Sequence, residues 1–101
     1  MDETTLSNLL KSTGLPVAYH HFVQPPTPPY IVYLFAFSSN FGADNRVYHK
    51  NPRYQVELYT EFKDPATEKL LEDLFDTNDI HWEKTETYID SEKLYQIIYE
   101  I

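Results

Sequence analysis

The sequence predicts an α+β domain made of one mainly antiparallel sheet, with two helices packed on one face and a projecting β-hairpin arm. Two stretches place leucines at helical spacing, whereas the remaining apolar stretches alternate or run continuously, as strands do. Short connections between the strands favour antiparallel hairpins. The 101 residues form a single domain, 1–101, with one core.

Two segments carry helix patterns. Residues 4–13 follow a threonine cap, place three leucines at i, i+3 and i+4, and end before Gly14. The second helix begins with Asp64 as its cap and Pro65 in its first turn, and runs to about Asp76. Its expected buried stripe consists of Leu70, Leu71, Leu74 and Phe75.

Five segments are expected to form strands. Residues 30–37 (YIVYLFAF) are continuously apolar, which predicts a central strand covered on both faces. Residues 53–61 alternate and predict a half-exposed strand. Prolines in QPPTPP, before the central strand, predict a stiff extended loop. The other expected strands are 17–23, 80–88 and 94–101, and the residues expected in or near the core of the central strand are Ile31, Val32, Leu34 and Phe35.

The stretch NRVYHKNPRYQVELYTE concentrates positive charge around a proline. It contains three of the chain's eight basic residues within eight positions. As one straight strand, residues 46–62 would span about 55 Å at roughly 3.3 Å per residue, whereas a compact chain of this length is only about 34 Å across. The strand therefore either breaks near Pro52 or belongs to a hairpin that projects. The candidate protein-interaction residues of this arm are Arg46, Tyr48, His49, Lys50 and Arg53.

Charge is segregated along the chain. Residues 1–63 contain five acids and five bases, whereas residues 64–101 contain eleven acids and three bases, so that 3 − 11 = −8 accounts for the whole net charge. A solvated face that aids solubility is one explanation. The other is a surface that repels polyanions or pairs with the basic arm of another subunit. We expect the arm to contact the acidic second helix or the C-terminal strands of its neighbour.

Few residues have the spacing of a catalytic or metal site. His20 and His21 are adjacent and would face opposite sides of a strand, and His81 with Glu83 supplies only two ligands on one strand face. The carboxylates of the second helix are expected on its solvated side. No glycine-rich phosphate loop or recognisable nucleophile motif is present. We therefore expect no enzymatic activity, no metal and no cofactor.

The compartment also follows from composition. The chain has no cysteine, which excludes disulfides and thiolate metal sites. No stretch approaches the roughly 20 apolar residues of a membrane span, and the first residues lack the pattern of a signal peptide. A soluble intracellular protein without a membrane partner is expected.

Nucleic-acid binding is a rival function for the arm. Its arginines and lysine, interleaved with Tyr48 and Tyr54, are residue types that contact phosphates and stack on bases. Three positive charges against a net charge of −8 are a weak electrostatic signal, because nucleic-acid-binding domains are usually basic. We expect no specific nucleic-acid binding and retain a nucleic-acid-binding module as an alternative.

Three segments resemble a known group of proteins. They are TGLPVAYHHF, then PPYIVYLFAFSSNFGADNRVYHKNPRYQVELYTEFKDPATEKLLEDLF, then HWEKTETYIDSEKLYQIIYEI, and together they cover nearly the whole chain. Their arrangement is similar to that of small structural proteins of tailed phages and prophages, the tail terminator or tail completion proteins of siphophages. The shared features are a short helix, a proline loop, an aromatic strand, a DNRVYH-like turn, a VELYT-like strand before a KDP helix start, and a closing LYQIIYEI-like strand.

The resemblance implies an α+β subunit that assembles into a ring, commonly a hexamer, without a cofactor. It implies a virion assembly protein in head–tail joining, located in the virion and, during assembly, in the host cytoplasm. Its implied partners are other copies of itself and other tail or neck proteins. The motifs are structural and assign no individual residue. A head–tail connector or head completion protein of similar size is an alternative.

Overall fold

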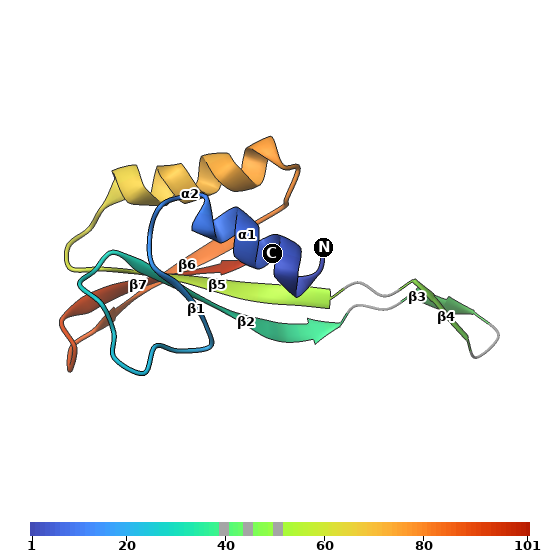
Figure 1. Cartoon of the computed structure of the whole chain (residues 1–101), viewed down its shortest axis with the longest axis horizontal. Helices are drawn as coiled ribbons and strands as arrows, with labels where there is room; N and C mark the ends of the chain where they lie inside the picture. The colour runs from blue at the N-terminus through green and yellow to red at the C-terminus, as the bar shows by residue number, and fades with distance from the viewer. Residues whose placement is uncertain (39–40, 44–45, 50–51) are drawn as a thin grey trace.

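The computed structural model describes residues 1–38, 41–43, 46–49 and 52–101, and for 41–43 and 46–49 it describes the backbone. The fold is α+β, as the sequence predicts, with a mixed, mostly antiparallel five-stranded sheet and two helices on one face (Figure 1). The elements in chain order are α1 (Glu3–Lys11), β1 (Val17–Tyr19), β2 (Tyr30–Ser38), β3 (Phe41–Ala43), β4 (Arg46–His49), β5 (Pro52–Thr60), α2 (Pro65–Thr77), β6 (Glu83–Ile89) and β7 (Leu94–Glu100).

The large sheet has the strand order β1-β2-β5-β7-β6. Three of its four pairings are antiparallel, as expected, but β1 and β2 pair in parallel with Val17 opposite Ile31. The expectation of hairpins throughout is wrong here, because residues 20–29 form a connection long enough to cross back to the start of the sheet. This proline-rich loop lies on the face opposite the helices in Figure 1, where Phe22 packs edge-on against Tyr30.

Both helices start at an aspartate. The Asp2 carboxylate accepts a hydrogen bond from the Thr5 amide at 2.8 Å, so the cap of α1 is Asp2 rather than the expected threonine. Asp64 caps α2 and Pro65 occupies its first turn, as expected. The expected stripe of α2 is wrong at Leu70, which is 47% exposed. The fully or nearly buried residues of α2 are Glu68, Leu71 and Phe75.

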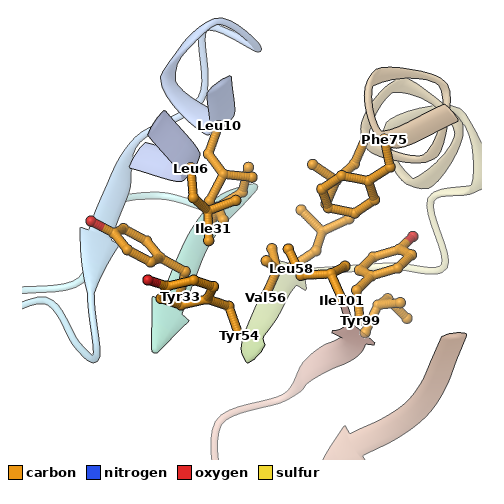
Figure 2. Close-up of a cluster of buried hydrophobic side chains, with 12 residues drawn as sticks. Leu6, Leu10, Ile31, Tyr33, Tyr54, Val56, Leu58, Phe75, Tyr99 and Ile101 are labelled. Carbon is orange, nitrogen blue, oxygen red and sulfur yellow. The ribbon is translucent and has the colours of Figure 1, made fainter. Parts of the chain in front are cut away.

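One continuous core lies between the helices and the sheet (Figure 2). Leu6 and Leu10 of α1 cover the first half of β2, and Phe75 of α2 packs against Tyr99 with ring centroids 5.6 Å apart. The expectation of a half-exposed strand is wrong for β5, since none of its residues is exposed and Glu57, on the face away from the helices, is buried. The predicted alternation is confirmed on the other face, because the helix-facing residues of β5 are all buried. Those residues are Tyr54, Val56, Leu58 and Thr60.

The aromatic strand β2 is an inner strand, yet only its first half is buried on both faces. Ile31 and Val32 are buried, Leu34 is half-buried, and Phe35 is 47% exposed. The expectation that Phe35 belongs to the core is therefore wrong. The reason is coverage, since β1 pairs only with the stretch from Ile31 to Tyr33 and leaves the rest of β2 uncovered on that edge.

Two other strands are shorter than expected. β1 ends at Tyr19 rather than near residue 23, because His20 adopts a left-handed backbone conformation with a φ of 68°. β6 starts at Glu83, so residues 80–82 lead into the strand instead of belonging to it. This segment, residues 80–82, places Trp82 against the core, with its ring centroid 5.7 Å from that of Tyr99.

The arm strands β3 and β4 form a separate two-stranded ribbon. Figure 1 shows this ribbon beyond the end of the β2–β5 pair, away from both helices. The molecule measures 50 × 28 × 22 Å along its principal axes. It is therefore much longer than the roughly 34 Å diameter of a compact chain of this length.

Candidate protein-interaction site

The arm continues the β2–β5 pair outward from the body. The antiparallel register of that pair extends to Ser38 opposite Pro52, with a bulge between Phe35 and Phe37. β3 and β4 then pair with Ala43 opposite Arg46, and a second irregularity lies between Phe41 and Gly42. Bulges bend a β-ribbon and increase its twist. One irregularity thus lies at the root of the arm and the other lies within the β3–β4 ribbon.

The structure places the five candidate residues in three settings. Arg46, Tyr48 and His49 belong to β4, in the arm ribbon. Lys50 lies outside the described residues. Arg53 is in β5, where it is half-buried and donates a hydrogen bond from Nε to the Ile101 carbonyl oxygen at 2.7 Å. Arg53 is thus fixed to the body at the root of the arm, unlike the exposed arm residue expected from the sequence.

Three exposed aromatic side chains surround the root of the arm. Tyr19 and Phe35 are each 47% exposed, and Phe37 is 60% exposed. The backbone amide of Phe35 donates a hydrogen bond to the Tyr19 hydroxyl oxygen at 3.2 Å, which links the two side by side. Aromatic residues are enriched in the cores of protein interfaces, because they supply large contact areas at low conformational cost. The root is therefore suited to contact another protein.

A hollow of about 460 Å³ lies within this aromatic root, and we call it the aromatic hollow. Two pairs of aromatic rings pack edge-on at the hollow. The ring centroids of Tyr19 and Tyr33 are 5.2 Å apart, and those of Phe35 and Tyr54 are 6.2 Å apart. Tyr33 also donates a hydrogen bond from its hydroxyl to the Glu3 carboxylate, which fixes that acid beside the rings. The hollow is lined by Glu3, Tyr19, Phe35 and Tyr54.

The electrostatics of the aromatic hollow are negative. Burial, and then the hydrogen bond to Glu3, raises the pKa of the Tyr33 hydroxyl above its ordinary value. Burial also raises the pKa of Tyr54, with further contributions from the charges of Glu3 and Asp2. The negative charges of Asp2 and Glu3, at the start of α1, thus disfavour ionisation of the neighbouring tyrosine hydroxyls. The same negative charges attract a cation.

A smaller hollow of about 240 Å³ lies on the other side of the root. Arg53 and Glu100, residues of opposite charge, both line it. Exposed Phe37 lies at its rim. Its lining consists of Ala36, Phe37, Arg53, Tyr54, Gln55, Glu100 and Ile101.

Much of the acidic charge of α2 is already paired inside the chain. Buried Glu68 accepts hydrogen bonds from Lys63 at 2.6 Å and Lys84 at 3.0 Å, and Lys84 also donates to Glu72 at 2.7 Å. The Tyr99 hydroxyl donates to the same Glu72 carboxylate at 2.6 Å. Glu72 is therefore part of the helix–sheet contact, not of the solvated side expected for it.

The two exposed carboxylates next along α2 have partners as well. Asp73 pairs with Lys69 at 2.5 Å, one helical turn away. Asp76 accepts a hydrogen bond from the Trp82 indole nitrogen at 2.8 Å. The ion pair with Lys69 reduces the negative charge that α2 offers to another subunit, and the hydrogen bond from Trp82 engages Asp76 without neutralising it.

The opposite sheet face carries a polar network around Glu57, which is nearly buried. Its carboxylate accepts hydrogen bonds from Gln55 at 2.6 Å and from the Tyr59 hydroxyl at 2.7 Å. Gln96 in turn donates to the Tyr59 hydroxyl oxygen at 2.9 Å. The network satisfies its own members across β5 and β7, which favours a structural role.

The histidines lie differently from the sequence expectation. Because β1 ends at Tyr19, His20 and His21 do not face opposite sides, and their Nδ1 atoms are 3.1 Å apart. His81 Nε2 lies 3.7 Å from a Glu83 carboxylate oxygen, with both side chains exposed. Among the residues that the structure describes, no group of three or more potential metal ligands comes together. Neither helix, α1 or α2, is long and apolar enough to cross a membrane.

No protein-family model matches the chain, and no curated protein is significantly similar to it.

The aromatic hollow is the part of the site that the sequence does not indicate. Phe35 stands in a continuously apolar run, and nothing in that run separates a core ring from an exposed one. Glu3 and Tyr19 are distant from Phe35 in sequence. Tyr19 reaches it through the parallel pairing of β1 with β2, and Glu3 through the position of α1 over that pair. The one available signal is the proline-rich loop, since its length permits that crossover.

Proposed function

We propose that this protein is a virion assembly protein of a tailed phage or prophage, a tail terminator or tail completion subunit that forms a ring at the head–tail interface. The observation that carries the proposal is the β3–β4 arm, which extends past a small α+β body. Ring subunits join through heterologous contacts, in which one patch meets a different patch on the next copy. An arm at one end of the subunit is suited to such a contact.

The sequence resemblance to tail terminator proteins supports the same assignment, and so does the chemistry of the described surface. The buried carboxylates Glu57 and Glu68 are satisfied by neighbouring side chains. Of the five exposed tyrosine and phenylalanine side chains among the described residues, three lie at the root of the arm, and the other two are Phe62 and Tyr88. Exposed aromatic rings beside a projecting ribbon favour a protein partner over a small substrate. The ring contains no cofactor in this proposal.

The test reverses the charge of the arm with Arg46→Glu and Lys50→Glu. Circular dichroism measures folding, and the joining of tails to heads is measured in an infected or reconstituted lysate. We expect normal folding and lost joining. The matched control reverses two exposed lysines outside the arm, Lys11→Glu with Lys93→Glu, which changes the net charge by the same amount.

The control separates the arm from net charge. Normal joining by the control, with none by the arm variant, supports an assembly role for the arm. Normal joining by a folded arm variant contradicts the proposal. Equal loss in both variants also contradicts it, since total charge and not the arm would then govern joining.

A further inference from the structure

We propose that the aromatic hollow binds a cationic side chain, and that its occupant is the basic arm of a second copy of this chain. The hollow combines a carboxylate, Glu3, with three aromatic rings in a volume of about 460 Å³. That volume is in the range of specific binding sites. Carboxylates and the faces of aromatic rings both attract lysine and arginine side chains.

The rings are positioned before any ligand binds. Tyr19 is held by the hydrogen bond from the Phe35 amide, and the hydroxyl of Tyr33 is held by Glu3. Tyr54 is nearly buried and packs edge-on against Phe35. Preorganised groups lose less conformational freedom when a ligand binds, so the entropic cost of binding is smaller and the affinity is higher.

The sign of the field selects the charge of the ligand. Asp2 and Glu3 both act on the Tyr54 hydroxyl, where their negative charges disfavour ionisation. Arg53, the basic residue in the described part of the root, borders the smaller hollow and does not line this one. A positively charged side chain is therefore the complementary occupant.

Three lysines of the chain are already engaged within it. Lys63, Lys69 and Lys84 each form an ion pair within the same chain. The arm stretch instead groups Arg46 and Lys50 with Tyr48, and arginine and tyrosine are the residue types most enriched in interface hot spots. This stretch is the densest positive charge in the sequence.

The acidic second helix is a less suitable acceptor for the arm than the aromatic hollow. Its carboxylates at Glu68, Glu72 and Asp73 are already paired with lysines. An arm that bound there would have to compete with these internal pairs. In the hollow, by contrast, the described partner of Glu3 is the neutral Tyr33 hydroxyl.

The experiment measures self-association of the full chain. Sedimentation follows the mass of the wild type up to about 1 mM, a concentration that detects even weak contacts. The hollow variant carries Glu3→Gln with Phe35→Leu, the arm variant carries Arg46→Gln with Lys50→Gln, and Phe37→Leu is the matched control at an exposed ring outside the hollow. Circular dichroism verifies that each variant folds.

We expect wild-type association with a dissociation constant that rises about tenfold or more in the hollow variant, since a carboxylate and a cation–π contact are both lost. Self-association of the arm variant should weaken to a similar extent, and Phe37→Leu should leave the dissociation constant unchanged. An equimolar mixture of the hollow and arm variants should form pairs, because one intact arm and one intact hollow remain between them. If Glu3→Gln with Phe35→Leu does not fold, Glu3→Gln alone gives the same test of charge.

Three results overturn the inference. They are a wild type that stays monomeric over the whole range, loss of association in the arm variant alone, and equal weakening by Phe37→Leu. The inference rests on the proposed function only for its choice of occupant. If the folded hollow variant still joins tails to heads, the hollow assignment fails and the function proposal survives, whereas joining by the charge-reversed arm variant contradicts the function proposal itself.

Discussion

The Nε atom of Arg53 lies 2.7 Å from the Ile101 carbonyl oxygen and donates a hydrogen bond to it, and the Ile101 amide donates to the Tyr54 carbonyl oxygen at 3.1 Å. These two contacts join the first residues of β5 to the last residue of the chain. They lie where the arm leaves the body. The β5 side of the base from which the arm emerges is therefore fixed to the C-terminal residue.

Replacing Arg53 with alanine should weaken this base. We expect the free energy of unfolding to fall by about 1–2 kcal/mol, because a charge-assisted hydrogen bond is lost at a half-buried position. Urea unfolding measures the change. The control Lys11→Ala, at an exposed helix end, should change stability by about 0.5 kcal/mol or less. An Arg53→Ala variant as stable as this control contradicts the assignment of the contact.

Neighbouring residues of β2 should differ sharply in their contribution to stability. Ile31→Ala should cost about 2–5 kcal/mol, because the side chain is fully buried in the core. Phe35→Ala should cost only about 1 kcal/mol, since half of the ring is already exposed to water. Thermal or denaturant unfolding of the two variants decides the order. A larger loss of stability for Phe35→Ala than for Ile31→Ala would show that the Phe35 ring belongs to the core.

The contrast within β2 indicates what sequence patterns can predict. The period of two in β5 predicts the buried set that starts at Tyr54 correctly, because each side chain on one strand face meets the same layer. A continuous apolar run carries no such information. How far along β2 the cover extends depends on where β1 and α1 end, and β1 ends at a left-handed His20 that composition does not predict.

Helix α2 illustrates a second limit. Its boundaries follow from Asp64 and Pro65, whose side chains act locally. Its buried face includes Glu68, which no hydrophobic pattern would select, and excludes Leu70. The choice depends on two lysines that approach Glu68 from other elements, so it is decided by tertiary contacts. The candidate site shows the same limit. The arm can be predicted from the length of one continuous segment, whereas the aromatic hollow forms through tertiary contacts and cannot.

Glu68 should make the protein sensitive to acid. Burial alone would raise the pKa of this carboxyl, but the hydrogen bonds from Lys63 and Lys84 outweigh burial and hold the pKa below its ordinary value of 4.5. A lowered folded-state pKa gives stability that is present above the unfolded-state pKa and is lost as the pH falls through the folded-state value. Unfolding measured between neutral pH and pH values below 4.5 should show this loss.

The Glu68→Gln variant provides the control for that titration. It should be less stable at neutral pH by about 1–3 kcal/mol, because a charged acceptor of two lysine hydrogen bonds is removed. It should also lose part of the acid dependence. An identical pH profile for Glu68→Gln and the wild type would show that the Lys63–Glu68–Lys84 contacts do not govern acid stability.

Tyr99 and Tyr59 should limit stability at alkaline pH. For both, burial and then a hydrogen bond to a carboxylate raise the pKa of the hydroxyl far above the ordinary value of 10. Their contribution is therefore complete below the unfolded-state pKa and is lost as the pH rises above it, by about 1.4 kcal/mol per pH unit for each group. Tyr99→Phe should cost about 1 kcal/mol at neutral pH through the lost bond to Glu72 and should reduce the alkaline slope. An unchanged slope in this variant argues against a buried, protonated Tyr99.

The protein should not bind double-stranded DNA tightly at physiological salt. The arm is the one dense basic stretch, but each subunit has a net charge of −8, and that charge multiplies with every copy added to a ring. In the proposed ring, DNA passing through would be repelled by the subunits as a whole, even where a basic residue approaches a phosphate. Fluorescence anisotropy with a labelled duplex, over a range of salt concentrations, measures the affinity.

A dissociation constant at or below the micromolar range, with a steep dependence on salt, would contradict the expectation and favour a nucleic-acid-binding module. Counterion release by an arm that contacts phosphates produces this salt dependence. Binding that is absent in the wild type and in the Arg46→Gln, Lys50→Gln variant alike leaves protein contact as the role of the arm.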